Sequence, residues 1–151
     1  MAQSIEQISF ELTANALAEQ ERALSDLRAR AGILLAAASV AGSFLGAKIS
    51  RDSFDAWSVL AMVSFLSCVG SAIWVLLPHE LVFAFRGEAI LAESDGRDMQ
   101  DAAEAYRTAG IWAEPHLNAN RDKIGELSDW LAVSCVMLAA EIVFWTLNLL
   151  C

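Results

Sequence analysis

Residues 56–77 read AWSVLAMVSFLSCVGSAIWVLL, a run of 22 residues without a single charged side chain. A helix needs about 17–25 predominantly apolar residues to cross the hydrocarbon core of a bilayer. Pro78 follows directly and marks the end of the run, because proline does not continue a helix readily. The stretch therefore predicts a membrane-spanning helix, and the rest of the chain is interpreted from it.

Two further apolar blocks lie on either side of this stretch. Residues 31–47 carry no charge, and residues 130–151 carry one charge, Glu141. Trp57, Trp74 and Trp130 lie near block ends, where aromatic residues meet the membrane interface. The pattern predicts an all-α integral membrane protein with three transmembrane helices.

The composition agrees with this interpretation. Hydrophobic residues make up 56% of the 151 residues and charged residues 19%, against about 45–50% and about 25% in soluble domains. The charges lie between the blocks, whereas a soluble helical protein would spread them along every helix. The net charge of −9 disfavours non-specific nucleic-acid binding. The cysteines have no paired spacing, so we expect neither a disulfide nor a metal site.

The distribution of basic residues predicts the orientation. We see no cleavable signal peptide. With a cytosolic N-terminus, eight of the ten Lys and Arg residues are cytosolic, which is the asymmetry that fixes topology. The eight are Arg22, Arg28, Arg30, Arg86, Arg97, Arg107, Arg121 and Lys123. We expect a multi-pass protein of the inner (cytoplasmic) membrane with its N-terminus in the cytosol and its C-terminus outside.

The predicted cytosolic parts are helical extensions of the spans. Residues 4–30 contain no Gly or Pro, and Phe10, Leu17 and Leu24 recur every seven residues, so one helix is expected from about residue 4 to 47. The loop after the second span should hold a short amphipathic piece, LVFAFRGEAILAES, and a turn, SDGRD. A helix beginning near Asp98 or Asp101 should follow, and a second should start at Pro115 and run into the third span.

The segments together form a single domain. They are a cytosolic helix (1–30), a first span (31–47), a second span (56–77), a cytosolic helical region (78–129) and a third span (130–151).

Several segments resemble a known group of membrane proteins. These are LSDLRARAGILLAAASVAGSFLGA, the FAFR after the second span, the EAYR helix, and NRDKIGELSDWLAVSCVMLAAEIVFW. In the order of the segments and in their residue pattern they resemble the SLATT-like membrane effectors, which include the transmembrane effectors of Pycsar and Hailong anti-phage systems. The resemblance implies an effector that answers a nucleotide signal by permeabilising or depolarising the membrane. The chain has no room for a separate cyclic-nucleotide-binding domain.

Glu141 lies in the middle of the third block. An ionisable side chain there costs about 2.5–3.5 kcal/mol on insertion scales and should face protein or water. Ser134 and Asn148 lie seven residues on either side and form one polar stripe with it. The stripe either lines or gates a pore, or Glu141 is buried, protonated and hydrogen-bonded and holds its helix to a neighbour.

The first and second spans carry small and hydroxyl residues at helical spacing. Ala38, Gly42 and Gly46 allow close helix contact, within one chain or between copies. Ser64, Ser67 and Ser71 are expected to bond their own helix backbone rather than line a pore. Because three helices cannot enclose a useful pore, a channel must be a homo-oligomer, and we expect a tetramer.

Cytosolic basic and aromatic residues are candidates for nucleotide binding. Arginines hold phosphates and aromatic rings stack on bases, although each residue alone also suits a solvated or membrane-flanking position. The candidates are Arg28, Arg30, Arg86, Arg107, Arg121, Lys123, Tyr106, Trp112 and His116. The ligand would be a nucleotide or short oligonucleotide made by a partner nucleotidyltransferase or cyclase.

No catalytic motif, cofactor or metal site is expected, since the chain lacks metalloprotease, hydrolase and phosphate-loop patterns. The function that the resemblance implies is an oligomeric inner-membrane effector or ion channel in anti-phage defence, controlled by a nucleotide signal on the cytosolic side. The alternative is a non-conducting membrane anchor or scaffold whose cytosolic helices bind a partner protein.

Overall fold

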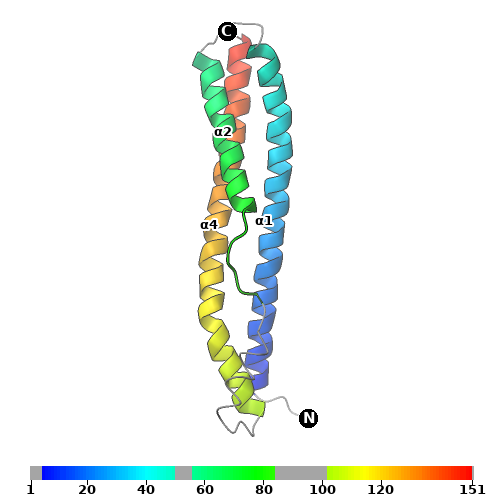
Figure 1. Cartoon of the computed structure of the whole chain (residues 1–151), viewed down its shortest axis with the longest axis vertical. Helices are drawn as coiled ribbons and strands as arrows, with labels where there is room; N and C mark the ends of the chain where they lie inside the picture. The colour runs from blue at the N-terminus through cyan, green and yellow to red at the C-terminus, as the bar shows by residue number, and fades with distance from the viewer. Residues whose placement is uncertain (1–4, 50–55, 84–101, 151) are drawn as a thin grey trace. The chain divides into compact units, whose positions relative to one another are not determined.

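The computed structural model describes residues 5–49, 56–83 and 102–150 (Figure 1). These residues form three helices, α1 (Ile5–Ile49), α2 (Ala56–Leu76) and α4 (Ala102–Leu150), and no strand occurs among them. The all-α prediction is confirmed.

The chain divides into two compact units. Unit 1 is Met1–Leu24 with His79–Ile124, and unit 2 is Ser25–Pro78 with Gly125–Cys151. Helices α1 and α4 each contribute to both units. Within unit 2, α1 and α4 run in the same direction and α2 runs in the opposite one (Figure 1). The three apolar blocks thus fall in unit 2, and most of the segments predicted to be cytosolic fall in unit 1.

Helix α1 is continuous, as the absence of Gly and Pro near its start predicts. Four of its buried residues lie seven apart, namely Leu17 and Leu24 in unit 1 and Ala31 and Ala38 in unit 2. A seven-residue repeat is the signature of helices that pack side by side at a shallow angle. The side chains become smaller on passing from unit 1 to unit 2, which permits closer backbone approach there.

Helix α4 corrects one prediction. Pro115 does not begin a new helix, because α4 continues through it from Ala102 to Leu150. The proline removes the hydrogen bond that residue 115 would donate to the carbonyl of Ile111, at about 3 kcal/mol. Ala113 and Asn120 are buried on either side, so packing keeps the helix whole. The helix begins directly after Asp101, whereas Asp98, the SDGRD turn and most of the expected amphipathic piece lie outside the described residues.

Two helices are long and apolar enough to cross a membrane. The mean hydropathy is 2.2 in α2 and 1.9 in the apolar part of α4, and only 33% and 17% of those stretches are buried within the chain. The core helix of a soluble protein would be mostly buried instead. In α1 no stretch of described residues meets the same criteria. The first expected span, 31–47, ends among residues whose side chains the structure does not describe.

Unit 2 buries several polar side chains and leaves many large apolar side chains exposed. Its small apolar core forms around Ala31, Val75 and Leu131. The buried polar residues are Ser64, Ser71, Ser134 and Glu141. The large apolar residues that remain exposed include Val59, Leu60, Met62, Val63, Leu66, Ile73, Val133, Val136, Ile142 and Val143. Water penalises this arrangement, whereas hydrocarbon favours it.

Candidate functional site

Two serine hydroxyls meet at the interface of α2 and α4. The Oγ atoms of Ser71 and Ser134 lie 2.7 Å apart. Each hydroxyl also contacts carbonyls of its own helix, since Ser71 lies 2.7 Å from the Ser67 oxygen and Ser134 lies 3.1 Å from the Trp130 oxygen. The expectation that Ser71 bonds its own backbone therefore holds, but the same hydroxyl also joins two helices. Sequence spacing alone gives no sign of this second contact.

A second polar pair joins the same two helices further along. The Asn148 side-chain amide donates a hydrogen bond of 3.1 Å to Ser58 Oγ. Because α2 and α4 run in opposite directions, both pairs fit the same residue-by-residue alignment of α2 against α4. The residues that join α2 and α4 in this way, together with Glu141 between them, are called the polar seam: Ser58, Ser71, Ser134, Glu141 and Asn148.

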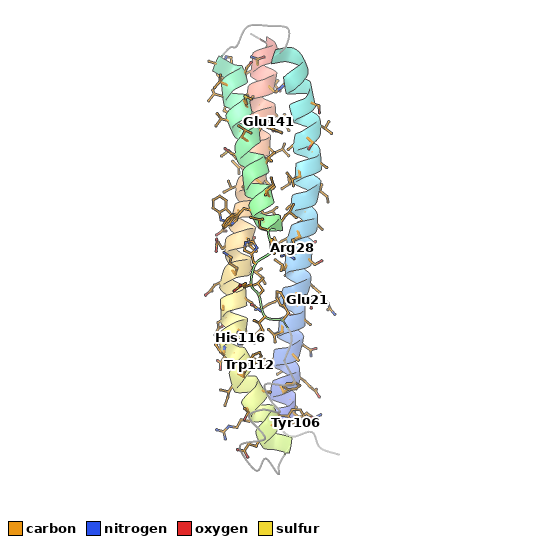
Figure 2. All side chains as sticks on the ribbon, in the orientation of Figure 1. Glu21, Arg28, Tyr106, Trp112, His116 and Glu141 are labelled. Atoms are coloured by element: carbon orange, nitrogen blue, oxygen red, sulfur yellow. The ribbon has the colours of Figure 1, made fainter. Side chains whose placement is uncertain are left out.

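Glu141 is the central residue of the polar seam, and Figure 2 marks its position on α4. The register places it opposite Ser64, which is also buried. Its side chain is 0% exposed, and within the described part of the chain neither carboxyl oxygen has a hydrogen-bond partner. A buried carboxylate without a partner is so unfavourable that the group takes up a proton or a cation. The site can therefore exchange positive charge.

A cavity of about 190 Å³ adjoins Glu141. It is lined by Ala41 of α1 and by Glu141, Ile142 and Trp145 of α4, all within unit 2. Glu141 and Trp145 lie one helical turn apart, so they border the cavity from neighbouring positions on one face.

The small residues of α1 face the interior of the same chain. Ala38 is fully buried. A Cβ atom placed on Gly42 would come within 2.7 Å of the Phe65 ring on α2, so any larger residue here would push the ring away. The surroundings of Gly46 are not described. Gly42 thus lies against α2, and Ala38 is buried within unit 2.

The nucleotide candidates do not gather at one place. In unit 2, Arg28 Nη2 donates a long hydrogen bond of 3.5 Å to the carbonyl of Leu77, just beyond the C-terminus of α2. A cation is favoured there, because helix C-termini carry partial negative charge. Arg30 forms an exposed ion pair with Asp26 on the preceding turn, at 2.6 Å. Both arginines therefore have structural partners.

In unit 1, Tyr106 and Arg107 line a groove of about 550 Å³ between α1 and α4. The other lining residues are Ile5, Ser9, Thr13, Gly110, Ile111, Glu114 and Leu117. The ring of Tyr106 also contacts Phe10, with 5.4 Å between centroids. The described lining combines one cation (Arg107), one carboxylate (Glu114), hydroxyl groups and apolar surface, so a ligand with an anionic group would have to meet Arg107 away from Glu114.

The remaining candidates lie apart from this groove's lining. Trp112 and His116 contact each other, with centroids 4.4 Å apart. Arg121 is exposed, Lys123 is half-buried, and Arg86 lies outside the described residues. Tyr106 and Arg107 are thus the only two of the predicted set among the groove's described lining residues.

Unit 1 also contains a polar contact that sequence analysis missed. Asn120 is buried; its Nδ2 donates to the carbonyl of Val82 at 2.8 Å, and its Oδ1 accepts from the Val82 amide at 3.3 Å. Gln20 of α1 donates to the carbonyl of Leu117 at 2.9 Å. The sequence gives no sign of these hydrogen bonds, because an asparagine five residues after a proline has no characteristic pairing pattern. The position of Asn120, seven residues before Leu127 and fourteen before Ser134, places it on the buried face of α4.

No cluster of three metal-ligating side chains occurs among the described residues, and Cys68 and Cys135 are both unpaired thiols. No family model matches this chain, and neither the curated proteins nor the solved structures provide a match. The function must therefore be inferred from the geometry of the polar seam, the cavity beside it and the groove of unit 1.

Proposed function

We propose that this chain is a three-span membrane protein whose homo-oligomer conducts ions under the control of a cytosolic signal. The observation that carries the proposal is Glu141, a fully buried carboxyl without a hydrogen-bond partner among the described residues, in the otherwise uncharged part of α4 after Asp129. Ionisable residues inside membrane helices are costly and mark ion or proton sites. The resemblance to SLATT-like effectors supports a role in anti-phage defence, with membrane depolarisation or permeabilisation as the outcome.

The ends of the apolar helices support the predicted orientation. The register of α2 and α4 brings Trp74 and Trp130 to the same level of unit 2, and both are exposed, as interfacial tryptophans are. Arg28 reaches the end of α2 at that level, and Arg30 follows it in α1. Basic residues beside this end favour its placement on the cytosolic side, with the third span leading to an outside C-terminus.

The polar seam suits a gate better than the wall of an open pore. Ser134 and Glu141 are buried inside one chain rather than on an outer face of unit 2. Separation of α2 from α4 would break two side-chain hydrogen bonds and would admit water to Glu141. We therefore propose that opening proceeds along the seam and that a tetramer supplies the complete conduction path.

The signal is proposed to enter at the groove of unit 1. Arg107 provides a cation for a phosphate and Tyr106 provides an aromatic ring beside it. A nucleotide or short oligonucleotide made by a partner enzyme has the matching chemistry. Arg28 and Arg30 are not part of this proposal, because their observed contacts are structural.

Ion flux in liposomes tests the proposal. Purified protein should release or admit a monovalent cation when the activating nucleotide is added to the side that unit 1 faces. Glu141→Gln should assemble normally and change the conductance or its dependence on pH, whereas Glu21→Gln, at an exposed position of unit 1, should behave like the wild type. Identical conductance of wild type and Glu141→Gln at every pH would remove Glu141 from the conduction path.

A non-conducting scaffold is the second proposed function. Ile5, Ile8 and Leu12 lie on one face of α1 and are 82%, 43% and 66% exposed. An exposed apolar stripe on a helix outside the apolar block favours a protein partner. Oligomers that insert in liposomes but pass no ions, while unit 1 captures a partner protein, would support this alternative.

A further inference from the structure

The carboxyl of Glu141 and the neighbouring cavity together favour a ligand that has both a positive charge and apolar surface. The carboxyl is buried and has no hydrogen-bond partner within the described residues. The cavity of about 190 Å³ beside it is open to one side, and its described lining, Ala41, Ile142, Trp145 and Glu141, presents almost only carbon. An apolar molecule would fill the space but would leave the carboxyl unpaired. A purely ionic ligand would pair with the carboxyl but would leave the walls uncovered.

The carboxyl can reach a ligand without losing an existing interaction. Its oxygens are covered in the observed rotamer, and no hydrogen bond holds them there. Rotation of the side chain to another staggered rotamer is the movement that would present the carboxylate to the cavity, and it breaks no hydrogen bond within the described residues. Among the described residues, the thiol of Cys68 on α2 is a titratable group close enough to interact with Glu141. From α1 the cavity wall is Ala41, and residues 31–43 contain no ionisable side chain.

We propose that this cavity binds a small lipophilic monocation of the organic ammonium type in exchange for a proton. The empty site holds Glu141 as the neutral acid. On binding, the carboxylic O–H bond breaks, the proton leaves to solvent, and the carboxylate pairs with the ammonium, so one positive charge enters as one leaves. The indole of Trp145 adds cation–π attraction, and Ala41 and Ile142 contact the apolar substituents.

The site goes beyond ion conduction, since binding requires neither an oligomeric pore nor a signal at unit 1. It also differs from a lipid-filled crevice. An acyl chain covers carbon surface alone, whereas an ammonium with apolar substituents satisfies the buried carboxyl as well. The cavity volume limits the ligand to about one aromatic ring or a few short alkyl groups around the charged nitrogen.

Benzyltrimethylammonium is the probe of choice, because its charge is permanent and it has no acidic proton to release. The purified full chain in detergent is titrated with it by calorimetry in two buffers of different ionisation heat. We expect saturable binding with about one proton released per cation, and an affinity that rises about tenfold per pH unit over the range where the site is protonated. Absence of binding, or binding without proton release, would overturn the proposal.

Matched variants locate the site. Glu141→Gln should weaken binding by at least about tenfold, and Glu21→Gln should not change it. Ala41→Leu should fill the cavity and remove binding while the carboxyl remains, whereas Ala37→Leu, at an exposed position one turn earlier, should bind normally. If Glu141→Gln does not fold, this alanine pair decides the question. Wild-type affinity in Ala41→Leu or in a folded Glu141→Gln variant would contradict the assignment.

A neutral isostere separates charge from shape. Neopentylbenzene has the shape of the probe without its charge, so it should compete weakly against benzyltrimethylammonium. Equal competition by the hydrocarbon would show that the cavity is an ordinary apolar site and would overturn the proposal. Because none of these measurements involves ion flux, failure here is distinguishable from failure of the proposed channel function.

Discussion

The hydroxyls of Ser71 and Ser134 lie 2.7 Å apart between two antiparallel helices. Glu141, whose carboxyl has no hydrogen-bond partner among the described residues, lies seven residues further along α4. The position of the two serines on the buried face shows that the polar stripe of α4 continues onto α2. The stripe is therefore an interface within the chain.

The first prediction concerns this serine pair. Ser71→Ala and Ser134→Ala should each destabilise unit 2, and a double-mutant cycle should give a coupling of about 0.6 kcal/mol, with about 1.7 as an upper value for hydrogen bonds between membrane helices. Unfolding in mixed detergents measures it. Ser39→Ala is the control, because the Ser39 hydroxyl donates to the carbonyl of Leu35 in its own helix and should show no coupling to Ser134.

The second prediction concerns Gly42. Gly42→Ile should lower the stability of unit 2 by about 1–3 kcal/mol, because the added atoms overlap the Phe65 ring. The matched substitution is Gly32→Ile, since no atom lies within 4 Å of a Cβ placed there. Melting temperature measures the loss of stability, and cross-linking shows whether the oligomer persists. If Gly42→Ile melts like the wild type but loses its oligomers, Gly42 contacts another copy rather than α2.

The third prediction concerns the hydrogen bonds between Asn120 and Val82 in unit 1. Asn120→Ala should cost about 1–3 kcal/mol, because the Val82 amide and carbonyl lose their partner. Faster hydrogen exchange or proteolysis at residues 79–83 would report the release. Asn118→Ala, at an exposed position of the same helix, should have no such effect. Unchanged exchange in Asn120→Ala would mean that other contacts hold this segment.

The fourth prediction concerns the groove of unit 1. Arg107→Glu should abolish binding of cyclic mononucleotides or short oligonucleotides while leaving membrane insertion intact, because the phosphate loses its cation. Binding to the wild type should weaken with salt. Arg121→Glu should have a smaller effect, since Arg121 is exposed and does not belong to the described lining of the groove. Calorimetry that detects no heat for the wild type would leave a protein partner as the trigger.

The sequence alone determined the helical class and the location of the main elements. The charge-free run 56–77 and the block that begins at Trp130 both became long, apolar and largely exposed helices. Helix α1 was predictable because nothing near its start interrupts it. Such features depend on local composition and on hydrophobic periodicity, which are readable without knowing what lies beside them.

Tertiary structure decided what composition cannot express. A proline in a favourable local context indicates a helix start, but buried residues on both sides of Pro115 kept α4 continuous. The spacing of Ser134, Glu141 and Asn148 predicted a stripe without saying what it faces. Only the register with α2 showed that two of these residues have partners and that Glu141 has none among the described residues. Hydrogen bonding across helices depends on the relative position of segments distant in the chain, and no local pattern encodes that position.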